Sequence, residues 1–133
     1  MKLLLDTHIF LWLINKDKRL NQKIIEIFKN PNHEVFLSVA SLWECVIKYQ
    51  LGKLNFAESP ETFIPKKRKE HIIKSLIIDE ESIKYLPTLP LIHKDPFDRL
   101  LICQSLQHNA KIVTDDKTIL KYPNINVFNL KDY

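Results

Sequence analysis

Hydrophobic positions along the chain follow two alternating patterns. Short, nearly continuous apolar runs are typical of buried strands, and longer stretches with apolar residues at helical spacing are typical of amphipathic helices. The expected strands cover residues 2–5, 34–38, 75–79, 111–114 and 125–130. The expected helices cover residues 7–15, 20–30, 40–51, 60–72, 80–86, 96–109 and 116–122. Because strands alternate with helices throughout, the pattern predicts an α/β fold whose central sheet is mostly parallel.

Glycine and proline mark several of the expected boundaries. Gly52 follows the helix at 40–51 and is a natural helix stop. Pro87 and Pro90 are expected to bound a loop. The stretch from 52 to 75 is only weakly patterned, so it is a candidate excursion from the main sheet layer. Because the chain has no internal repeat, low-complexity segment or flexible linker, residues 1–133 are expected to form a single domain.

Composition narrows the class of protein. Hydrophobic residues make up 45% of the chain and charged residues 27%, which is a globular profile, and the apolar runs are too short to span a membrane. No signal peptide is expected, and Cys45 and Cys103 are expected to be buried free thiols, so the predicted location is the reducing cytoplasm. A net charge of +4 permits an anionic partner without requiring one. A single glycine excludes the glycine-rich loops that cradle nucleotide phosphates.

Acidic residues gather where the predicted strands end or the following helices begin. They are Asp6, Glu44, Asp98, Asp115 and Asp116. Ligands of parallel α/β sheets bind at the carboxyl ends of the strands, so these carboxylates are expected to converge on one edge. Two carboxylates about 4 Å apart repel by about 4 kcal/mol at an effective dielectric constant of about 20, against a total stability of about 5–15 kcal/mol. A neutralising cation is therefore expected, and oxygen ligands suit Mg²⁺ or Mn²⁺, the ions of phosphodiester hydrolysis.

Each acid also has a purely structural interpretation. Asp6, and either Asp115 or Asp116, can cap the helices that follow them. Ser41–Glu44 fits a capping box, and Asp95–Asp98 fits a helix start with aspartate at the N-cap, proline at the first position and an acid at the third. Capping is the commoner use of any one such residue. It is the expected convergence of several acids that favours a metal site.

Four segments give the sequence a family resemblance. In chain order they are LLLDTHIFLW, SVASLWECVIKYQLGKL, LPLIHKDPFDRLLICQ and IVTDD. Together they are similar to the PIN-domain family, and more closely to its VapC-type toxins of bacterial toxin–antitoxin pairs. The match runs over essentially the whole chain. HKDPFDRLLI is its most specific part, whereas a single motif such as TDD is weak.

The resemblance implies a three-layer α/β/α sandwich with a Mg²⁺- or Mn²⁺-dependent endoribonuclease site. It also implies an RNA substrate, a homodimer and a cognate VapB-like antitoxin whose C-terminal segment occupies the acidic groove. The four acids of the family, which would hold the metal or orient the attacking water, fall on Asp6, Glu44, Asp98 and Asp116. Accessory positions are Asp95, Thr114, Asp115 and Arg99. The T-x-D pattern favours Asp116 as the fourth acid, but the choice between the two adjacent aspartates stays open.

Several other residues have two interpretations each. The run Lys66–Lys69 fits either contacts with RNA phosphates or a solvated helix face, and Arg99 fits either a phosphate contact or a salt bridge. His8 and His93 flank the acids and are expected to support the site or the fold rather than to act as bases. The aromatic residues expected in the core or at an interface, before any role in base stacking, are Trp12, Trp43 and Phe97.

Three other functions fit parts of the pattern. A PIN nuclease of RNA processing would cleave RNA without an antitoxin. A non-catalytic binding module would keep the fold and would not need to bind Mn²⁺. A phosphatase of the haloacid dehalogenase type would need a D-x-D motif, but the chain has His8 where the second acid would stand, so this hypothesis is the weakest.

Overall fold

The computed structural model describes residues 1–92 and 94–133, so the expectation for His93 lies outside the described residues. At the centre is a five-stranded sheet in the order β3-β2-β1-β4-β5, and every neighbouring pair of strands is parallel. The predicted α/β fold with a parallel sheet is therefore confirmed. The strands are β1 (Lys2–Leu5), β2 (Glu34–Ser38), β3 (Lys74–Leu76), β4 (Lys111–Thr114) and β5 (Val127–Asn129).

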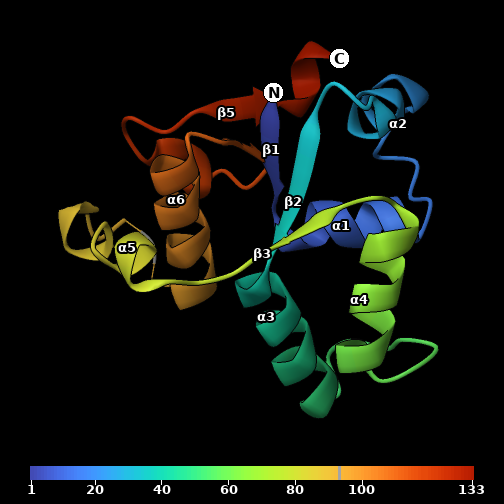
Figure 1. The fold of residues 1–133 in the computed structure, drawn as a ribbon. Helices are drawn as coiled ribbons and strands as arrows, with labels where there is room; N and C mark the ends of the chain where they lie inside the picture. Colours follow the sequence, from blue (N-terminus) through green and yellow to red (C-terminus); the bar gives the residue numbers. More distant parts are fainter. Residues whose placement is uncertain (93) are drawn as a thin grey trace.

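Helices cover both faces of the sheet, which gives the expected three-layer arrangement (Figure 1). In that view α1, α2 and α4 lie to the right of the strands, α5 and α6 lie to the left, and α3 extends below. No helix in the described part of the chain is long and apolar enough to cross a membrane. The α-helices are α1 (Thr7–Ile14), α2 (Gln22–Lys29), α3 (Val39–Gln50), α4 (Pro60–Glu70), α5 (Glu80–Ile83) and α6 (Pro96–His108). Short 3₁₀ turns are η1 (Leu86–Thr88), η2 (Ile119–Lys121) and η3 (Leu130–Asp132).

The alternation of side chains along the central strand β1 builds a core on each face of the sheet. Leu3 and Leu5 point to one face and belong to the same buried cluster as Phe10 of α1. Leu4 points to the other face and packs with Leu101 of α6. All three leucines are fully buried, as expected for a central parallel strand that is covered by helices on both sides.

The edge of the sheet differs from the prediction. The strand expected at 75–79 is the shorter β3, which pairs with β2 and forms the edge strand. The weakly patterned stretch before it contains α4, which lies outside the sheet. Gly52 follows α3 with a φ of 74°, a left-handed conformation that glycine adopts without strain, and this confirms the predicted helix stop.

Two predicted helices are only partly formed. In place of a helix at 116–122 there is the single turn η2, because the Asp116 carboxylate accepts hydrogen bonds from the amides of Thr118 and Ile119 and folds the chain into a local turn. The helix expected at 80–86 ends as the four-residue α5. Pro87 does not open a loop but lies within η1, since proline fits the first positions of a helical turn.

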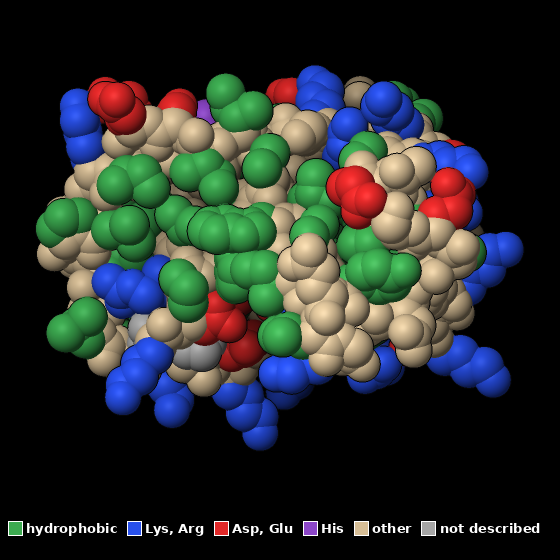
Figure 2. All heavy atoms as spheres, turned by 90° about the horizontal axis from the view of Figure 1, so that it is seen from below, with side chains coloured by type: hydrophobic (Ala, Val, Ile, Leu, Met, Phe, Trp, Pro, Cys, Tyr) green, Lys and Arg blue, Asp and Glu red, His purple; other side chains and the backbone are tan. Residues whose placement is uncertain are grey.

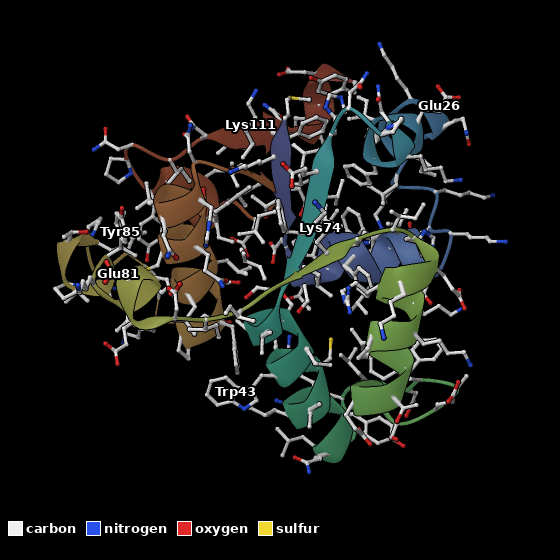
Figure 3. All side chains as sticks on the ribbon, viewed as in Figure 1. Glu26, Trp43, Lys74, Glu81, Tyr85 and Lys111 are labelled. Atoms are coloured by element: carbon white, nitrogen blue, oxygen red, sulfur yellow. The ribbon has the colours of Figure 1, made fainter. Side chains whose placement is uncertain are left out.

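One face of the molecule carries many exposed hydrophobic side chains. Figure 2 shows it from below the view of Figure 1, with hydrophobic side chains over much of its area, a small acidic group among them and basic side chains along one edge. Trp43, labelled beside α3 in Figure 3, is 54% exposed, and Leu51 at the end of that helix is 63% exposed. Trp43 is therefore not a core residue.

Candidate active site

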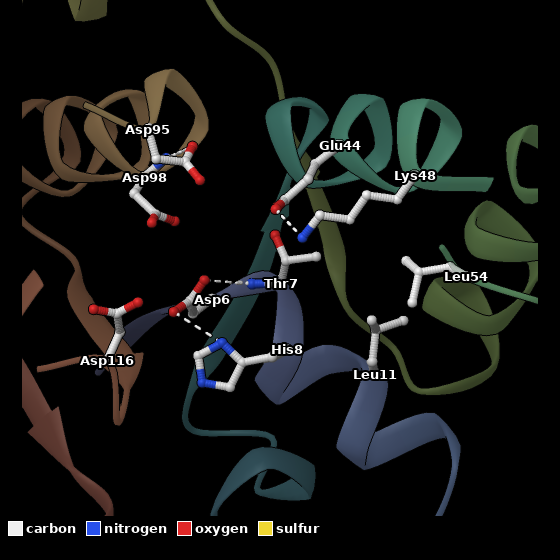
Figure 4. Close-up of a pocket in the computed structure, with 10 residues that line it drawn as sticks. All are labelled: Asp6, Thr7, His8, Leu11, Glu44, Lys48, Leu54, Asp95, Asp98 and Asp116. Atoms are coloured by element: carbon white, nitrogen blue, oxygen red, sulfur yellow. Dashed lines mark hydrogen bonds and ion pairs between the residues drawn. The ribbon is translucent and has the colours of Figure 1, made fainter. Parts of the chain in front are cut away.

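A pocket of about 270 Å³ lies at the edge of the sheet where the parallel strands end (Figure 4). Five of its described lining residues are acidic, and they come from the end of β1, from α3, from the start of α6 and from the segment after β4. The expected convergence of carboxylates from separate segments is therefore present. The described lining consists of Asp6, Thr7, His8, Leu11, Glu44, Lys48, Leu54, Asp95, Asp98 and Asp116.

Asp6 is held from several sides. It follows the last residue of β1, is only 3% exposed, and caps α1 as its structural interpretation predicts, because Oδ1 accepts a hydrogen bond from the Thr7 amide at 2.7 Å. Oδ2 accepts a hydrogen bond from Thr114 Oγ1 at 2.6 Å and lies 3.2 Å from His8 Nδ1. Thr114, expected as an accessory residue, thus contacts the carboxylate directly.

Glu44 projects into the pocket from within α3 and is only 6% exposed. Its Oε2 forms an ion pair with Lys48 Nζ at 2.8 Å. Its Oε1 is buried and has no hydrogen-bond partner among the described residues. Since a buried carboxylate oxygen without a donor costs free energy, this atom indicates a missing partner in the pocket.

The capping-box interpretation of Glu44 is wrong. The N-cap of α3 is Ser38, whose hydroxyl accepts a hydrogen bond from the Ala40 amide, and the helix begins at Val39. Ser41 therefore lies inside the helix, and its hydroxyl accepts a hydrogen bond from Thr7 Oγ1 at 2.8 Å. Glu44 is too far from the helix start to satisfy the first amides, so capping does not account for its burial.

The start of α6 contributes two of the acids. Asp95 is the N-cap, and its Oδ1 accepts hydrogen bonds from the amides of Phe97 at 2.8 Å and Asp98 at 3.3 Å, with Pro96 at the first helical position. The predicted helix start is therefore confirmed. Asp98 lies in the first turn, is 8% exposed and lines the pocket together with Asp95. The residues that start α6 therefore also line the pocket.

The structure separates the two adjacent aspartates after β4. Asp116 lines the pocket, and its amide donates a hydrogen bond to Thr114 Oγ1 at 3.0 Å. Asp115 is not among the described lining residues, and its carboxylate instead pairs with His8 Nε2. This arrangement favours Asp116 as the fourth acid of the site.

His8 bridges two carboxylates, since Nδ1 faces Asp6 and Nε2 faces Asp115. Burial opposes the positive charge on the imidazole, but the hydrogen bonds and charges of the two aspartates outweigh it and raise the pKa of His8 from 6.5 to about 9. His8 is therefore a cation at neutral pH. It offsets part of the negative charge at the pocket, which agrees with a supporting role.

The donor set of the pocket is of the kind that binds hard divalent cations, because all the acids offer carboxylate oxygens. As the side chains stand, however, no group of three or more His, Cys, Asp or Glu within residues 1–92 and 94–133 is arranged to hold a metal ion. The chemistry of the donors and the unpartnered Glu44 Oε1 fit a cation, whereas the present side-chain positions do not yet form a coordination sphere.

The Arg99 side chain is hydrogen-bonded mainly to backbone carbonyl groups. Its guanidinium donates hydrogen bonds to the carbonyls of Pro90 and Leu86 and to the Tyr122 hydroxyl. Neither of the two interpretations from the sequence describes this arrangement, since Arg99 forms no ion pair among the described residues and is not part of the pocket lining. It links α6 to η1 and to Pro90.

The basic run on α4 is largely engaged in local contacts. Lys66 pairs with Glu58 at 2.8 Å, and Lys67 pairs with Glu70 at 3.1 Å. Arg68 donates a hydrogen bond to the carbonyl of Ile73 at 2.8 Å. These contacts favour the solvated helix face over a dedicated phosphate-binding surface.

Sequence reasoning missed Lys48 and the apolar residues beside it. Lys48 lies four residues after Glu44 on α3, a spacing that brings oppositely charged side chains together on one helix face. This spacing could have predicted the ion pair from the sequence. No sequence pattern pointed to Leu11 and Leu54, because only the fold brings α1 and the segment after α3 to the same pocket.

Comparison with known families decides the classification. The family model of the PIN domain matches residues 3–125. The chain belongs to the PIN-domain family. A search among curated proteins finds no match for this PIN domain.

Solved structures agree with the fold of this PIN domain. One is VapBC2 from Rickettsia felis bound to a DNA fragment from their promoter, with a TM-score of 0.76, 19% identity, and coverage of 97% of this chain and 98% of that chain. DNA-bound VapBC from Salmonella typhimurium has a TM-score of 0.70, 19% identity, and coverage of 98% of each chain. VapBC-1 from nontypeable Haemophilus influenzae has a TM-score of 0.64, 18% identity, and coverage of 98% and 99%. At these identities the likeness establishes the fold alone.

The His8 bridge predicts a pH-dependent stability. The folded-state pKa of about 9 lies above the ordinary value of 6.5, so the stabilisation is complete below pH 6.5 and is lost as pH rises through about 9. We expect metal-free His8→Gln to unfold at a lower urea concentration than the wild type at about pH 6, and the difference to disappear by about pH 10.

His71→Gln is the matched control for this experiment, because burial lowers the pKa of His71 and no charge bridge is lost. Its urea midpoint should not show the same deficit at acidic pH. An equal deficit of His8→Gln at both pH values would contradict the charged bridge.

Proposed function

We propose that this PIN domain is a Mg²⁺- or Mn²⁺-dependent endoribonuclease that acts as the toxin of a type II toxin–antitoxin pair in the cytoplasm. The observation that carries the proposal is the pocket in which Asp6, Glu44, Asp98 and Asp116 meet from four separate segments while Glu44 Oε1 has no donor among the described residues. Such a concentration of buried negative charge destabilises a fold unless a cation binds there.

These four residues would hold the ion. When bound, a divalent cation offsets the negative charge of a phosphodiester and makes water a better nucleophile at neutral pH. The chain contributes the positions of the carboxylates. Thr114 and the Thr7 amide orient Asp6, and the turn amides of Thr118 and Ile119 orient Asp116.

Asp98 lies where a helix starts, and helix N-termini favour negative charge, so the same place suits a carboxylate and an approaching phosphate. A carboxylate that does not hold the ion can accept a hydrogen bond from the attacking water and take its proton. Asp95, Asp115 and Thr114 would support this arrangement. Arg99 links α6 to η1 and to Pro90 and so acts on the site only through the position of α6.

The structures that share the fold support a protein partner. They include VapBC complexes from three bacteria and a toxin–antitoxin complex from Klebsiella pneumoniae, which supports a cognate VapB-like antitoxin for this chain. Exposed hydrophobic side chains, among them Trp43 and Leu51, support a homodimer, because large exposed apolar areas commonly mark interfaces. RNA would enter the acidic pocket when the antitoxin segment leaves it.

Two other functions remain as competitors. A PIN nuclease of RNA processing would have the same pocket and no antitoxin. A non-catalytic module would keep the fold without needing the cation. The four acids in one pocket favour a nuclease over the binding module, and the toxin–antitoxin neighbours favour a toxin over an RNA-processing enzyme.

Metal binding should raise the thermal stability of the protein. Binding to the folded state alone stabilises by about 2.7 kcal/mol at a free metal concentration of about one hundred times Kd. We expect Mn²⁺ or Mg²⁺ to raise the melting temperature of the wild type, and Glu44→Gln to reduce that rise. Scanning calorimetry with and without chelator measures both. A melting temperature that does not respond to millimolar metal would remove the metal from the proposal.

Asp98→Asn distinguishes a metal ligand from a helix-dipole residue. If Asp98 only interacted favourably with the dipole of α6, its replacement would lower the free energy of unfolding by about 0.3–1 kcal/mol and leave RNA cleavage intact. As a member of a repulsive cluster, it should instead give a metal-free protein of unchanged or higher melting temperature, while metal affinity and RNA cleavage fall steeply.

Asp95→Asn is the control for the helix start, because asparagine caps helices as well as aspartate does and folding should change little. Melting of the metal-free variants and cleavage of RNA are measured side by side. A destabilised Asp98→Asn that still cleaves at nearly the wild-type rate would rule out its assignment.

Growth of bacteria tests the toxin part of the proposal. Induced expression should arrest growth, Asp6→Asn should not, and co-expression of the product of an adjacent upstream antitoxin gene should restore growth. Glu26→Gln should still arrest growth, because Glu26 is exposed on α2 and lies outside the described pocket lining. If cells tolerate the wild type as well as Asp6→Asn, RNA processing becomes the better hypothesis.

A further inference from the structure

The pocket has two chemically different ends. In Figure 4 the carboxylates of Asp95, Asp98 and Asp116 lie on one side, and Leu11 and Leu54 form an apolar wall on the other. The side chain of Lys48 reaches inward from that apolar side and ends at Glu44. Lys48 is the one lysine or arginine among the described lining residues.

Lys48 joins the buried pocket to solvent. Its side chain is 45% exposed, whereas the side chain of Glu44, with which it pairs at 2.8 Å, is 8% exposed. A lysine ammonium is positively charged at neutral pH, so the contact joins two opposite charges. An ion pair with one exposed partner is weak, and the flexible lysine stem allows the ammonium to reach another anion once a bound cation replaces it at Glu44.

An RNA phosphate needs a cation at this place. The described lining has five carboxylates, and a divalent ion would offset two of these charges. Without a further positive charge the pocket would still repel an anionic substrate. The basic run on α4 does not serve this need, because Lys66, Lys67 and Arg68 are engaged elsewhere.

We propose that Lys48 is a substrate-binding residue whose ammonium leaves Glu44 and contacts a phosphate of the bound RNA. The apolar wall of Leu11 and Leu54 lies against the nucleoside at the same end of the pocket. This inference rests on the proposed nuclease function and adds to it the direction in which the RNA lies in the pocket. The carboxylates are at one end and a phosphate-binding lysine is at the other.

The experiment compares Lys48→Gln, Lys48→Arg and the control Lys53→Gln. Glutamine keeps most of the length of the side chain and a donor for Glu44 but removes the charge, and Lys53 is exposed and outside the described lining. Binding of a labelled single-stranded RNA oligonucleotide is followed by fluorescence anisotropy over a range of salt concentrations, in calcium and in chelator. Melting curves and steady-state cleavage kinetics are recorded for the same proteins.

Lys48→Gln should bind the oligonucleotide about fivefold more weakly, which corresponds to about 1 kcal/mol. The slope of log K against log salt should become shallower by about 0.7, the value for one lost phosphate contact on a single strand. KM should rise while kcat changes little, Lys48→Arg should restore binding, and Lys53→Gln should behave as the wild type.

Two outcomes would overturn this inference without affecting the nuclease proposal. One is a Lys48→Gln protein with the affinity and salt slope of Lys53→Gln. The other is an unchanged salt slope with a lower melting temperature and lower kcat, which would make Lys48 only the counter-ion that positions Glu44. A wild-type chain that neither binds nor cuts RNA would instead contradict the proposed function, and this inference with it.

Discussion

The hydrogen bond from Thr114 Oγ1 to Asp6 Oδ2 is the contact around which the rest of the pocket is arranged. It joins the ends of β1 and β4, two neighbouring strands of the sheet, at 2.6 Å in a buried position. The same carboxylate starts α1 through the Thr7 amide and receives His8. Strand end, helix start and charge balance therefore depend on one side chain, and a change at Asp6 would disturb all three.

Burying the carboxylates costs free energy, and the fold offsets this cost to different extents at different residues. The Asp6 carboxylate accepts hydrogen bonds from a backbone amide and a hydroxyl group, and the Asp116 carboxylate accepts hydrogen bonds from two backbone amides. Glu44 has a lysine on one oxygen and no described donor on the other. Asp6 and Asp116 thus have partners within the protein, whereas one buried oxygen of Glu44 is left for a partner from outside. The least satisfied atom is also the one most directly available for function.

Much of the fold was predictable because its signals are local. The apolar run of β1, the glycine after α3 and the Asp95–Pro96 start of α6 each determine structure within a few residues. The convergence of Asp6, Glu44, Asp98 and Asp116 also followed from one general property of parallel sheets, the alignment of strand ends.

The wrong predictions arose where one local sequence pattern fits two different structures. The periodicity after Asp116 fits a helix, but the Asp116 side chain competes for the amides and produces a turn. Ser41 and Glu44 have the spacing of a capping box, but Ser38 starts the helix earlier. The partners of His8 and the place of Leu54 depend on contacts between distant segments, and spacing along the chain does not record these contacts.

The rings of Trp43 and Phe97 meet edge to face, with centroids 5.1 Å apart. Each residue directly precedes a pocket acid, Glu44 or Asp98, so this aromatic contact braces α3 against α6 at the level of those two carboxylates. The width of the pocket is therefore set from outside it, by hydrocarbon packing that does not respond to charge or salt. Such packing holds the two helices together at low and high salt alike, whereas an ion pair at the same place would weaken as salt is added.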